Sequence, residues 1–207
     1  GLPIVERWHA VAVYSNQLYS VGGLSMTNVY VYDGSTWMAV ASLPDLGLGC
    51  HRAVTYNGYL YAVGGSDGVG STNKVYRFDG AGWTPDTDLP EPRQCHGADV
   101  LENRLYAAGG FNSSGDLRSM VVFDGTNWTA GVDLPDARYY LPIVTFNGHL
   151  YAIGGFTTGN LTTTNVYRYP ALIRESGVVP DSGSFTGGYP VVISGSSLCN
   201  GSDVTNV

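Results

Sequence analysis

The composition of this 207-residue chain, with 29 glycines, 15 tyrosines and only 13% charged residues, favours short strands and glycine-rich turns over helices. The formal net charge is −7 and lysine and arginine form no cluster, which argues against binding to the phosphate backbone of a nucleic acid. No apolar run approaches the roughly 20 residues of a membrane-spanning helix, so we expect no such segment here.

One short pattern occurs four times: a Leu-Tyr pair is followed by two residues and then by two glycines. The glycine pairs begin at Gly22, Gly64, Gly109 and Gly154, which are 42, 45 and 45 residues apart. A fixed period in this range is typical of repeat architectures, in which each repeat is one supersecondary unit.

Each repeat predicts four strands in chain order, most clearly in the second repeat. The strands "HRAVTY" (51–56) and "YLYAVGG" (59–65) are joined by a tight Asn-Gly turn at 57–58. A third strand, "NKVYRFD" (73–79), is followed by an Asp-Gly turn and an outer strand, "GWTPDTDLP" (82–90). A single four-stranded sheet leaves two apolar faces uncovered, so we expect the repeats to stack around an axis as a β-propeller.

The glycine pairs and the aromatic residues of each repeat are interpreted as packing residues. Glycine permits close backbone approach and a positive φ where the chain leaves a strand. The tyrosine before each pair and the tryptophan after each Asp-Gly turn are large enough to fill the wedge between adjacent sheets.

These repeats resemble kelch repeats. The resemblance rests on the Gly-Gly pairs, the Leu-Tyr pairs before them, and Trp37, Trp83 and Trp128. It covers residues 2 to about 172 and implies an all-β, kelch-type β-propeller over residues 1–173, with four four-stranded blades here and further blades outside this sequence. The fourth repeat departs from the pattern, because it has no tryptophan and Pro170-Ala171 replaces the Asp-Gly turn.

The period is lost after Ile173, so residues 174–207 are expected to be a linker and the first part of a second domain. The stretch 177–207 resembles the opening of a TIG/IPT module, an immunoglobulin-like β-sandwich, and a plain linker hairpin is the alternative. The match rests on Pro180, Gly183, Gly187, Gly188, Val191, Ile193, Gly195, Leu198 and Val204. A typical sandwich has about 100 residues, so the resemblance implies that the chain continues past Val207.

Cysteines and glycosylation sequons bear on the cellular compartment. Cys50 and Cys95 are one repeat period apart, and we predict a disulfide between them if their Cα atoms lie within about 7 Å. Four Asn-x-Ser/Thr sequons occur, at Asn112, Asn127, Asn160 and Asn200. These features favour a glycosylated extracellular or cell-surface protein over a cytosolic propeller with free thiols.

Three arginines are candidates for ligand binding. Arg93 and Arg138 stand 16 residues before the first glycine of their pair, and Arg7 is one residue off this position. Loops on the faces of a propeller usually carry its function, so these arginines could hold carboxylates or acidic glycans through bidentate contacts. The alternative is structural, with each arginine paired to a nearby acid such as Glu91 or Asp136, or bonded to loop carbonyls.

Three histidines also share one repeat position. His9, His51 and His96 stand 13 residues before the first glycine of their pair. Equivalent positions in successive blades are usually too far apart for one ion with bonds of ~2.1 Å, so we expect no metal site and no cofactor. Hydrogen bonds from the histidines to neighbouring backbone are the expected alternative.

No catalytic triad, zinc spacing, P-loop or paired-carboxylate motif stands out, so the chain is not expected to be an enzyme. We expect a structural or adhesive extracellular protein whose partners are the other protein subunits of a coat, matrix or filamentous appendage, and glycans. Two alternatives stay open: a secreted radical copper oxidase of the galactose-oxidase type, and an intracellular kelch adaptor that binds a protein. A faint likeness to the oxidase site lies in "ARYY" (137–140) and Cys50.

Overall fold

The computed structural model describes residues 1–44 and 47–169, all within one compact unit, Gly1–Leu172. The described residues form strands and turns and contain no helix. Nothing in these residues has the helical length and apolar character needed to cross a membrane. The predicted domain boundary after residue 173, the TIG/IPT module and the sequon at Asn200 lie outside the described residues.

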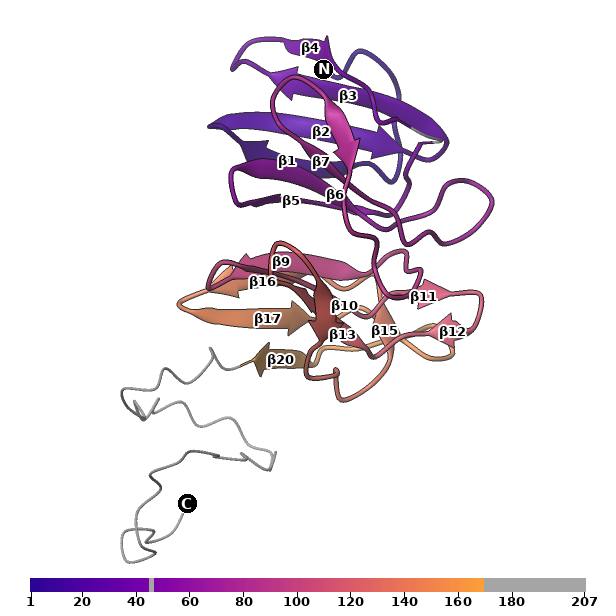
Figure 1. Cartoon of the computed structure of the whole chain (residues 1–207). Coiled ribbons are helices and arrows are strands. Elements are labelled where there is room, and N and C mark those ends of the chain that lie inside the picture. The colour runs from indigo at the N-terminus through magenta and orange to yellow at the C-terminus, as the bar shows by residue number, and fades with distance from the viewer. Residues whose placement is uncertain (45–46, 170–207) are drawn as a thin grey trace, which may run out of the picture. The chain divides into compact units, whose positions relative to one another are not determined.

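Four antiparallel sheets follow one another along the chain, each with its strands side by side in chain order (Figure 1). The first sheet contains β1 (Ala10–Tyr14), β2 (Gln17–Gly23), β3 (Met26–Tyr32) and β4 (Trp37–Val40). The second contains β5 (Arg52–Tyr56), β6 (Tyr59–Val63), β7 (Val75–Phe78) and β8 (Trp83–Pro85). The third contains β9 (Gly97–Leu101), β10 (Arg104–Ala108), β13 (Met120–Phe123) and β14 (Trp128–Ala130).

The fourth sheet has three strands among the described residues: β16 (Ile143–Phe146), β17 (His149–Ile153) and β20 (Val166–Tyr169). The prediction of four-stranded meanders is therefore confirmed for the first three repeats. The fourth repeat is the one in which the sequence lacks the tryptophan and the Asp-Gly turn.

The loops between second and third strands contain short strands that the sequence analysis did not predict. In the third repeat, β11 (Phe111–Asn112) pairs with β12 (Gly115–Asp116). In the fourth, β18 (Phe156–Thr157) pairs with β19 (Leu161–Thr162) and also with β15 (Arg138–Tyr139), which precedes the sheet. These loops are thus ordered hairpins that can hold side chains in place.

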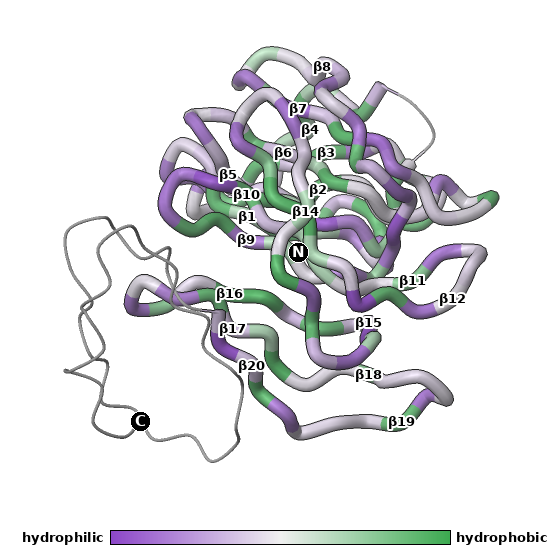
Figure 2. The backbone as a smooth tube through the Cα atoms, turned by 60° about the horizontal axis from the view of Figure 1, so that its bottom comes forward, coloured by the Kyte–Doolittle hydropathy of each residue, from purple (hydrophilic) through white to green (hydrophobic). Residues whose placement is uncertain are grey.

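The sheets pack through their first strands, because β1 contacts β5, β5 contacts β9, and β9 contacts β16. Groups of three aromatic side chains fill the spaces between neighbouring sheets. Figure 2, which colours the backbone by hydropathy, shows that the apolar stretches follow the strands. The trio between the first two sheets is Tyr14, Tyr19 and Phe78, and the trio between the second and third is Tyr56, Tyr61 and Phe123. The repetition of this trio explains why the tyrosine recurs with the sequence period.

The tryptophans also join neighbouring sheets. The indole N–H of Trp83 donates to the carbonyl of Ala41 at 3.0 Å, and that of Trp128 donates to the carbonyl of Thr87 at 2.9 Å. Trp83 packs against Phe78 with ring centroids 5.2 Å apart, and Trp128 stacks on Phe123 at 4.9 Å. The interpretation of these residues as packing residues is confirmed.

The glycine pairs mark the closest approach between sheets. The first glycine of each pair has φ between +57° and +66°. A Cβ on Gly64 would lie 2.7 Å from the carbonyl oxygen of Arg93, and one on Gly109 would lie 2.6 Å from that of Arg138. The predicted need for close approach and positive φ is confirmed, and the near neighbour is the segment that leads into the next sheet.

The first and fourth sheets each keep apolar side chains exposed. Val11 and Val13 of β1 are 51% and 61% exposed, and Phe146 and Val166 of the fourth sheet are 62% and 53% exposed. Further blades stay a prediction, and these are the side chains that such blades would cover.

Candidate functional site

One residue just before the first strand of each sheet has a left-handed backbone conformation. These four junction residues stand 14 residues before the first glycine of each pair: Trp8, Cys50, Cys95 and Tyr140, with φ of 61°, 53°, 54° and 50°. Three backbone hydrogen bonds of 2.8 Å join these residues in chain order. Cys50 donates its N–H to the carbonyl of Trp8, Cys95 to that of Cys50, and Tyr140 to that of Cys95. This hydrogen-bonded chain brings one residue from each of four repeats side by side.

The junction residues line a cavity of about 170 Å³ together with His9, His51 and Arg52. Its rim is aromatic, because Trp8 is 48% exposed and Tyr140 is 44% exposed. Beside Trp8, the guanidinium carbon of Arg7 lies 5.5 Å from the centre of the indole ring, a cation–π distance.

A larger hollow of about 370 Å³ lies at the hairpin ends of the first sheet, lined by residues that include Val13, Tyr32 and Asp33. The Asp33 carboxylate accepts hydrogen bonds from the N–H groups of Ser35 and Thr36, each at 2.7 Å, and so stabilises its own turn. We therefore place the candidate site at the junction residues, where reactive and aromatic side chains from several repeats meet.

The two cysteines of the cavity are free thiols, so the predicted disulfide between Cys50 and Cys95 is not formed in this structure. The two thiols and the hydroxyl of Tyr140 share the lining of the cavity and influence one another's ionisation. Cys50 is half-buried, whereas Cys95 is 2% exposed.

These contacts give the two thiols different acidities. The hydrogen bond from Cys95 lowers the pKa of Cys50 to about 7, and Tyr140 and the charge of Arg52 also lower it, while burial opposes them. The same hydrogen bond raises the pKa of Cys95, and burial raises it further. At neutral pH, Cys50 therefore has thiolate character while Cys95 keeps its proton.

Arg52 holds a positive charge beneath the thiols. Its Nε donates to the carbonyl of His96 at 2.6 Å, and its Nη2 donates to the carbonyl of Leu141 at 3.3 Å. The side chain thus reaches from the second sheet to the segments that lead into the third and fourth sheets.

Arg93 is inside the protein and does not face a ligand. Its side chain is fully buried, and its guanidinium donates to the carbonyls of Gly109 and Ser119 at 3.0 and 3.1 Å, to Ser119 Oγ at 3.0 Å, and to the Glu91 carboxylate at 2.8 Å. The binding role expected for Arg93 does not fit this burial, whereas the structural alternative does.

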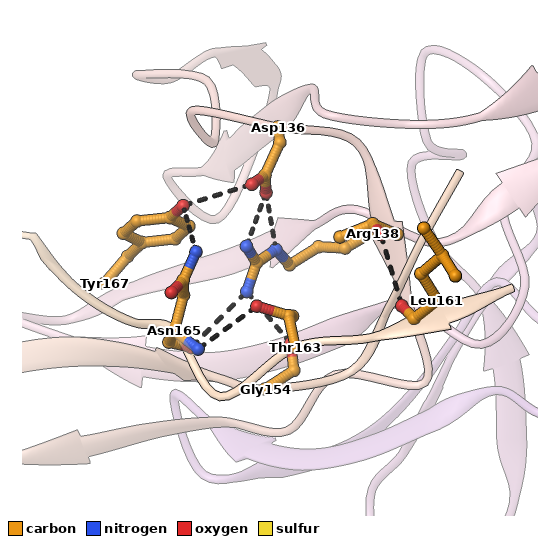
Figure 3. A network of polar contacts seen from close by, with 8 residues as sticks. Asp136, Arg138, Gly154, Leu161, Thr163, Asn165 and Tyr167 are labelled. Carbon is orange, nitrogen blue, oxygen red and sulfur yellow. Dashed lines mark hydrogen bonds and ion pairs between the residues drawn. The ribbon is translucent and has the colours of Figure 1, made fainter. Parts of the chain in front are cut away.

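Arg138 repeats this arrangement one sheet further along (Figure 3). It is fully buried, pairs with Asp136, and donates to the carbonyls of Gly154 and Asn165 at 2.9 and 3.5 Å. The hydroxyl of Tyr167 donates to the other carboxylate oxygen of Asp136 at 3.1 Å. Of the three predicted binding arginines, only Arg7 is exposed.

The histidines form no metal site. Among the described residues, no group of three or more His, Cys, Asp or Glu side chains is arranged to hold an ion. His51 and His96 are buried, and their ring nitrogens make no hydrogen bond of good geometry, contrary to the expected bonds to backbone. Burial lowers the pKa of His51 to about 3 and that of His96 well below its usual value.

Aromatic side chains extend from the cavity rim over the neighbouring loop hairpins. The ring of Tyr140 lies 6.1 Å from Phe156, which stacks on Tyr139 at 5.6 Å, and Tyr139 contacts Phe111 at 5.4 Å. This aromatic strip carries half-buried Phe111 and Phe156 together with exposed Tyr140.

The sequons differ in their surroundings. Asn127 and Asn160 are exposed, whereas Asn112 is half-buried and its side-chain N–H₂ donates to the carbonyl of Pro92 at 3.0 Å. Asn160 accepts a hydrogen bond from Tyr139 through its Oδ1, which leaves its nitrogen available.

Of the cavity lining, only Cys50 and Cys95 were among the predicted site residues; His9 and His51 were expected to be structural, Tyr140 was noted only within the "ARYY" likeness, and Trp8 and Arg52 were not considered. The signal that identifies Trp8 and Tyr140 is the repeat position 14 residues before the glycine, which they share with the two cysteines. Arg52 carries no comparable sequence signal, because only the packing of three sheets brings its side chain under the cavity.

The pattern of the Kelch motif matches residues 47–79 and 92–130. The second and third repeats thus carry the Kelch motif. Kelch domain-containing protein SSO1033 of Saccharolobus solfataricus is 35% identical over 81 residues, which are 39% of this chain and 11% of that protein. The chain thus spans only a small part of the length of this kelch relative.

A solved structure, that of YjhT, is similar to the described chain. The TM-score is 0.72 at 17% sequence identity, and the match covers 83% of this chain and 68% of that chain. At this identity the likeness supports the kelch-type propeller fold and says nothing of function.

Removing the buried guanidinium of Arg93 should destabilise the kelch repeats strongly. In Arg93→Met, the carbonyls of Gly109 and Ser119 and the Glu91 carboxylate lose their partner, and we expect a loss of about 3–5 kcal/mol in denaturant unfolding. The matched control is Arg118→Met, whose side chain is 61% exposed and pairs with Asp133 at 3.3 Å. The control should cost under about 1 kcal/mol, and equal losses would contradict the structural role.

The buried histidines should weaken the fold in mild acid. Because their folded pKa values lie below the unfolded value, the unfolded chain binds more protons, and stability falls as the pH drops below about 6.5. Each histidine should contribute about 1.4 kcal/mol per pH unit in unfolding measured between pH 6.5 and 5. His96→Leu, which copies the buried Leu141 of the fourth repeat, should flatten this slope, and an unchanged slope would contradict the assignment.

Proposed function

We propose that this chain is a non-enzymatic binding module of an extracellular or cell-surface assembly, and that it contacts other protein subunits through the face at the junction residues. The observation that carries this proposal is the small cavity with an aromatic rim, formed where four repeats meet. Glycans are a second class of partner for the same face.

The size of the cavity favours a single anchoring side chain of a protein partner. At about 170 Å³ it lies below the several hundred Å³ that drug-sized ligands occupy. Exposed tryptophan and tyrosine at a rim provide large contact area with little loss of side-chain freedom, and such residues dominate the binding energy of many protein interfaces.

The loop hairpins give the proposed interface its extent. The aromatic strip from Tyr140 to Phe111 continues from the cavity across β15, β18 and β11. A partner that placed one side chain in the cavity would lie against this strip.

The extracellular setting rests on the sequons and on the resemblance of 177–207 to a TIG/IPT module. Two of the sequons, at Asn127 and Asn160, are exposed on turns, where a bulky glycan meets no packing partner. An intracellular kelch adaptor would use the same binding face without glycans.

A radical copper oxidase is the second candidate, favoured by one observation. Tyr140 lines the same cavity as Cys50 and Cys95, and such an enzyme needs a tyrosine crosslinked to a cysteine. If the full-length protein contained stoichiometric copper and a Cys-Tyr bond that survives reduction, the proposal of a binding module would be wrong and that of an oxidase would take its place.

Selection of peptides tests the binding face. A phage-displayed random peptide library panned on the reduced chain should yield peptides that share one anchor residue. Tyr140→Ala and Trp8→Ala should each weaken the best peptide by at least about tenfold in calorimetry, because they remove the rim of the cavity. Val132→Ala, 73% exposed and outside the lining of the cavity, is the control and should bind as wild type does. Peptides that bind all variants equally would show that the face is elsewhere.

Glycan mapping tests the compartment. Intact mass of the protein from its natural source should fall after glycosidase treatment, and peptide mapping should find glycans on Asn127 and Asn160. Asn112 should be unmodified, since a glycan there would break the hydrogen bond to Pro92. An unchanged mass with all thiols free would favour the intracellular adaptor.

A further inference from the structure

Two cysteines from neighbouring sheets meet on the floor of the cavity. The backbone N–H of Cys95 donates to the carbonyl of Cys50 at 2.8 Å, and both side chains line the same cavity. Backbones joined by such a bond keep their Cα atoms within the ~7 Å that a disulfide allows. The separation of the two backbones therefore meets the distance requirement for a disulfide.

The left-handed backbone is not what distinguishes this pair, because all four junction residues share it. The side chains distinguish it. At this repeat position the second and third repeats, which are neighbours, both have cysteine, whereas the first has Trp8 and the fourth has Tyr140.

Unequal exposure gives the two thiols different roles. Cys50 is half-buried at the cavity, so a small molecule that enters can reach its sulfur. Cys95 is 2% exposed and lies against Cys50, so its sulfur is reached most easily from within the protein. This is the arrangement of an attacking and a resolving cysteine.

The charges around Cys50 favour its thiolate. Arg52 is the charged neighbour, and Cys95 and Tyr140 lie in the same lining. His9 and His51 complete the lining, which contains no carboxylate. A partly exposed cysteine in an electropositive cavity is the kind that reacts, whereas a buried thiol in apolar surroundings is inert.

We propose that Cys50 and Cys95 are a redox-active thiol pair, which a low-molecular-weight disulfide oxidises to a reversible disulfide between the second and third sheets. This proposal does not depend on the binding partner, and it differs from a permanent structural crosslink because the backbone hydrogen bond holds the reduced pair together without a disulfide.

The reaction takes place in two exchange steps. The Cys50 thiolate attacks one sulfur of the small disulfide, so a new S–S bond forms, the old one breaks, and one small thiol leaves with a proton. Cys95 then loses its proton and attacks the sulfur of Cys50, which releases the second small thiol. In total the two protein thiols lose two electrons and two protons, which the small disulfide takes up as two thiols.

The first step prepares the second. The hydrogen bond to Cys50 is the main reason that the pKa of Cys95 is raised, and the charge of Cys50 adds to it. Once Cys50 is in a mixed disulfide its negative charge is gone, so this repulsion disappears and Cys95 ionises more easily.

The test uses the full chain with Cys199→Ser, so that only the pair reacts. Incubation in mixtures of oxidised and reduced glutathione, followed by acid quenching, denaturation and alkylation, should show the two thiols disappearing together and returning with excess reduced glutathione. In Cys95→Ser, the reaction should stop with one glutathione bound to Cys50. In Cys50→Ser, Cys95 should react at least tenfold more slowly than Cys50 does in wild type.

The pH dependence separates an activated thiol from an ordinary one. The rate of alkylation of Cys50 by iodoacetamide should reach half its maximum near pH 7, below the value for an unperturbed thiol, about 8.5. Tyr140→Phe keeps the ring and removes the hydroxyl, so the midpoint should move to higher pH while the melting temperature stays close to that of wild type.

Three results would overturn the proposal. The first is a pair that stays reduced in oxidised glutathione while circular dichroism shows the folded chain. The second is a Cys95→Ser variant that traps no glutathione. The third is a crosslink that resists reduction, which would identify a bond between cysteine and Tyr140.

Discussion

The fold depends on a contact in which one sheet passes over the chain segment that leads into the next. The second glycine of the first three pairs donates its N–H to a carbonyl of that segment, as in Gly65 to Arg93 and Gly110 to Arg138, both at 2.8 Å. At this distance there is no room for a side chain, so the first glycine must lack a Cβ and take a positive φ. All other inter-sheet contacts, including the aromatic trios and the tryptophan hydrogen bonds, require the sheets to be held this close.

The same contact explains why the arginines are buried. The carbonyls of Arg93 and Arg138 accept the hydrogen bonds from the glycine pair of the preceding repeat. Their guanidinium groups donate to the first glycine of their own repeat, Gly109 for Arg93 and Gly154 for Arg138. A guanidinium has five N–H donors, so it can satisfy several carbonyls that close packing removes from water. Glu91 and Asp136 balance the charge locally, which makes burial of each cation acceptable.

Two residues after each arginine position, the chain turns through the left-handed conformation and places the junction residues side by side. In this region the repeats differ most in chemistry, because backbone hydrogen bonds alone maintain the geometry and the side chains are free to vary. Tryptophan, cysteine and tyrosine therefore occupy equivalent positions around one small cavity. The backbone at these positions is the same in every repeat, whereas the side chains differ. Both the proposed binding face and the thiol pair follow from this difference.

The sequence by itself determined the all-β class, the four repeats, their strand order and the packing roles of the glycines, tyrosines and tryptophans. These features are periodic, and a period in sequence reflects a contact that each repeat makes in the same way with the next. It did not determine the surroundings of Arg93, the reach of Arg52 under two sheets, or the meeting of Cys50 and Cys95 as free thiols in one cavity. Those depend on side chains from three or four repeats meeting at one point, and only the tertiary structure sets such distances.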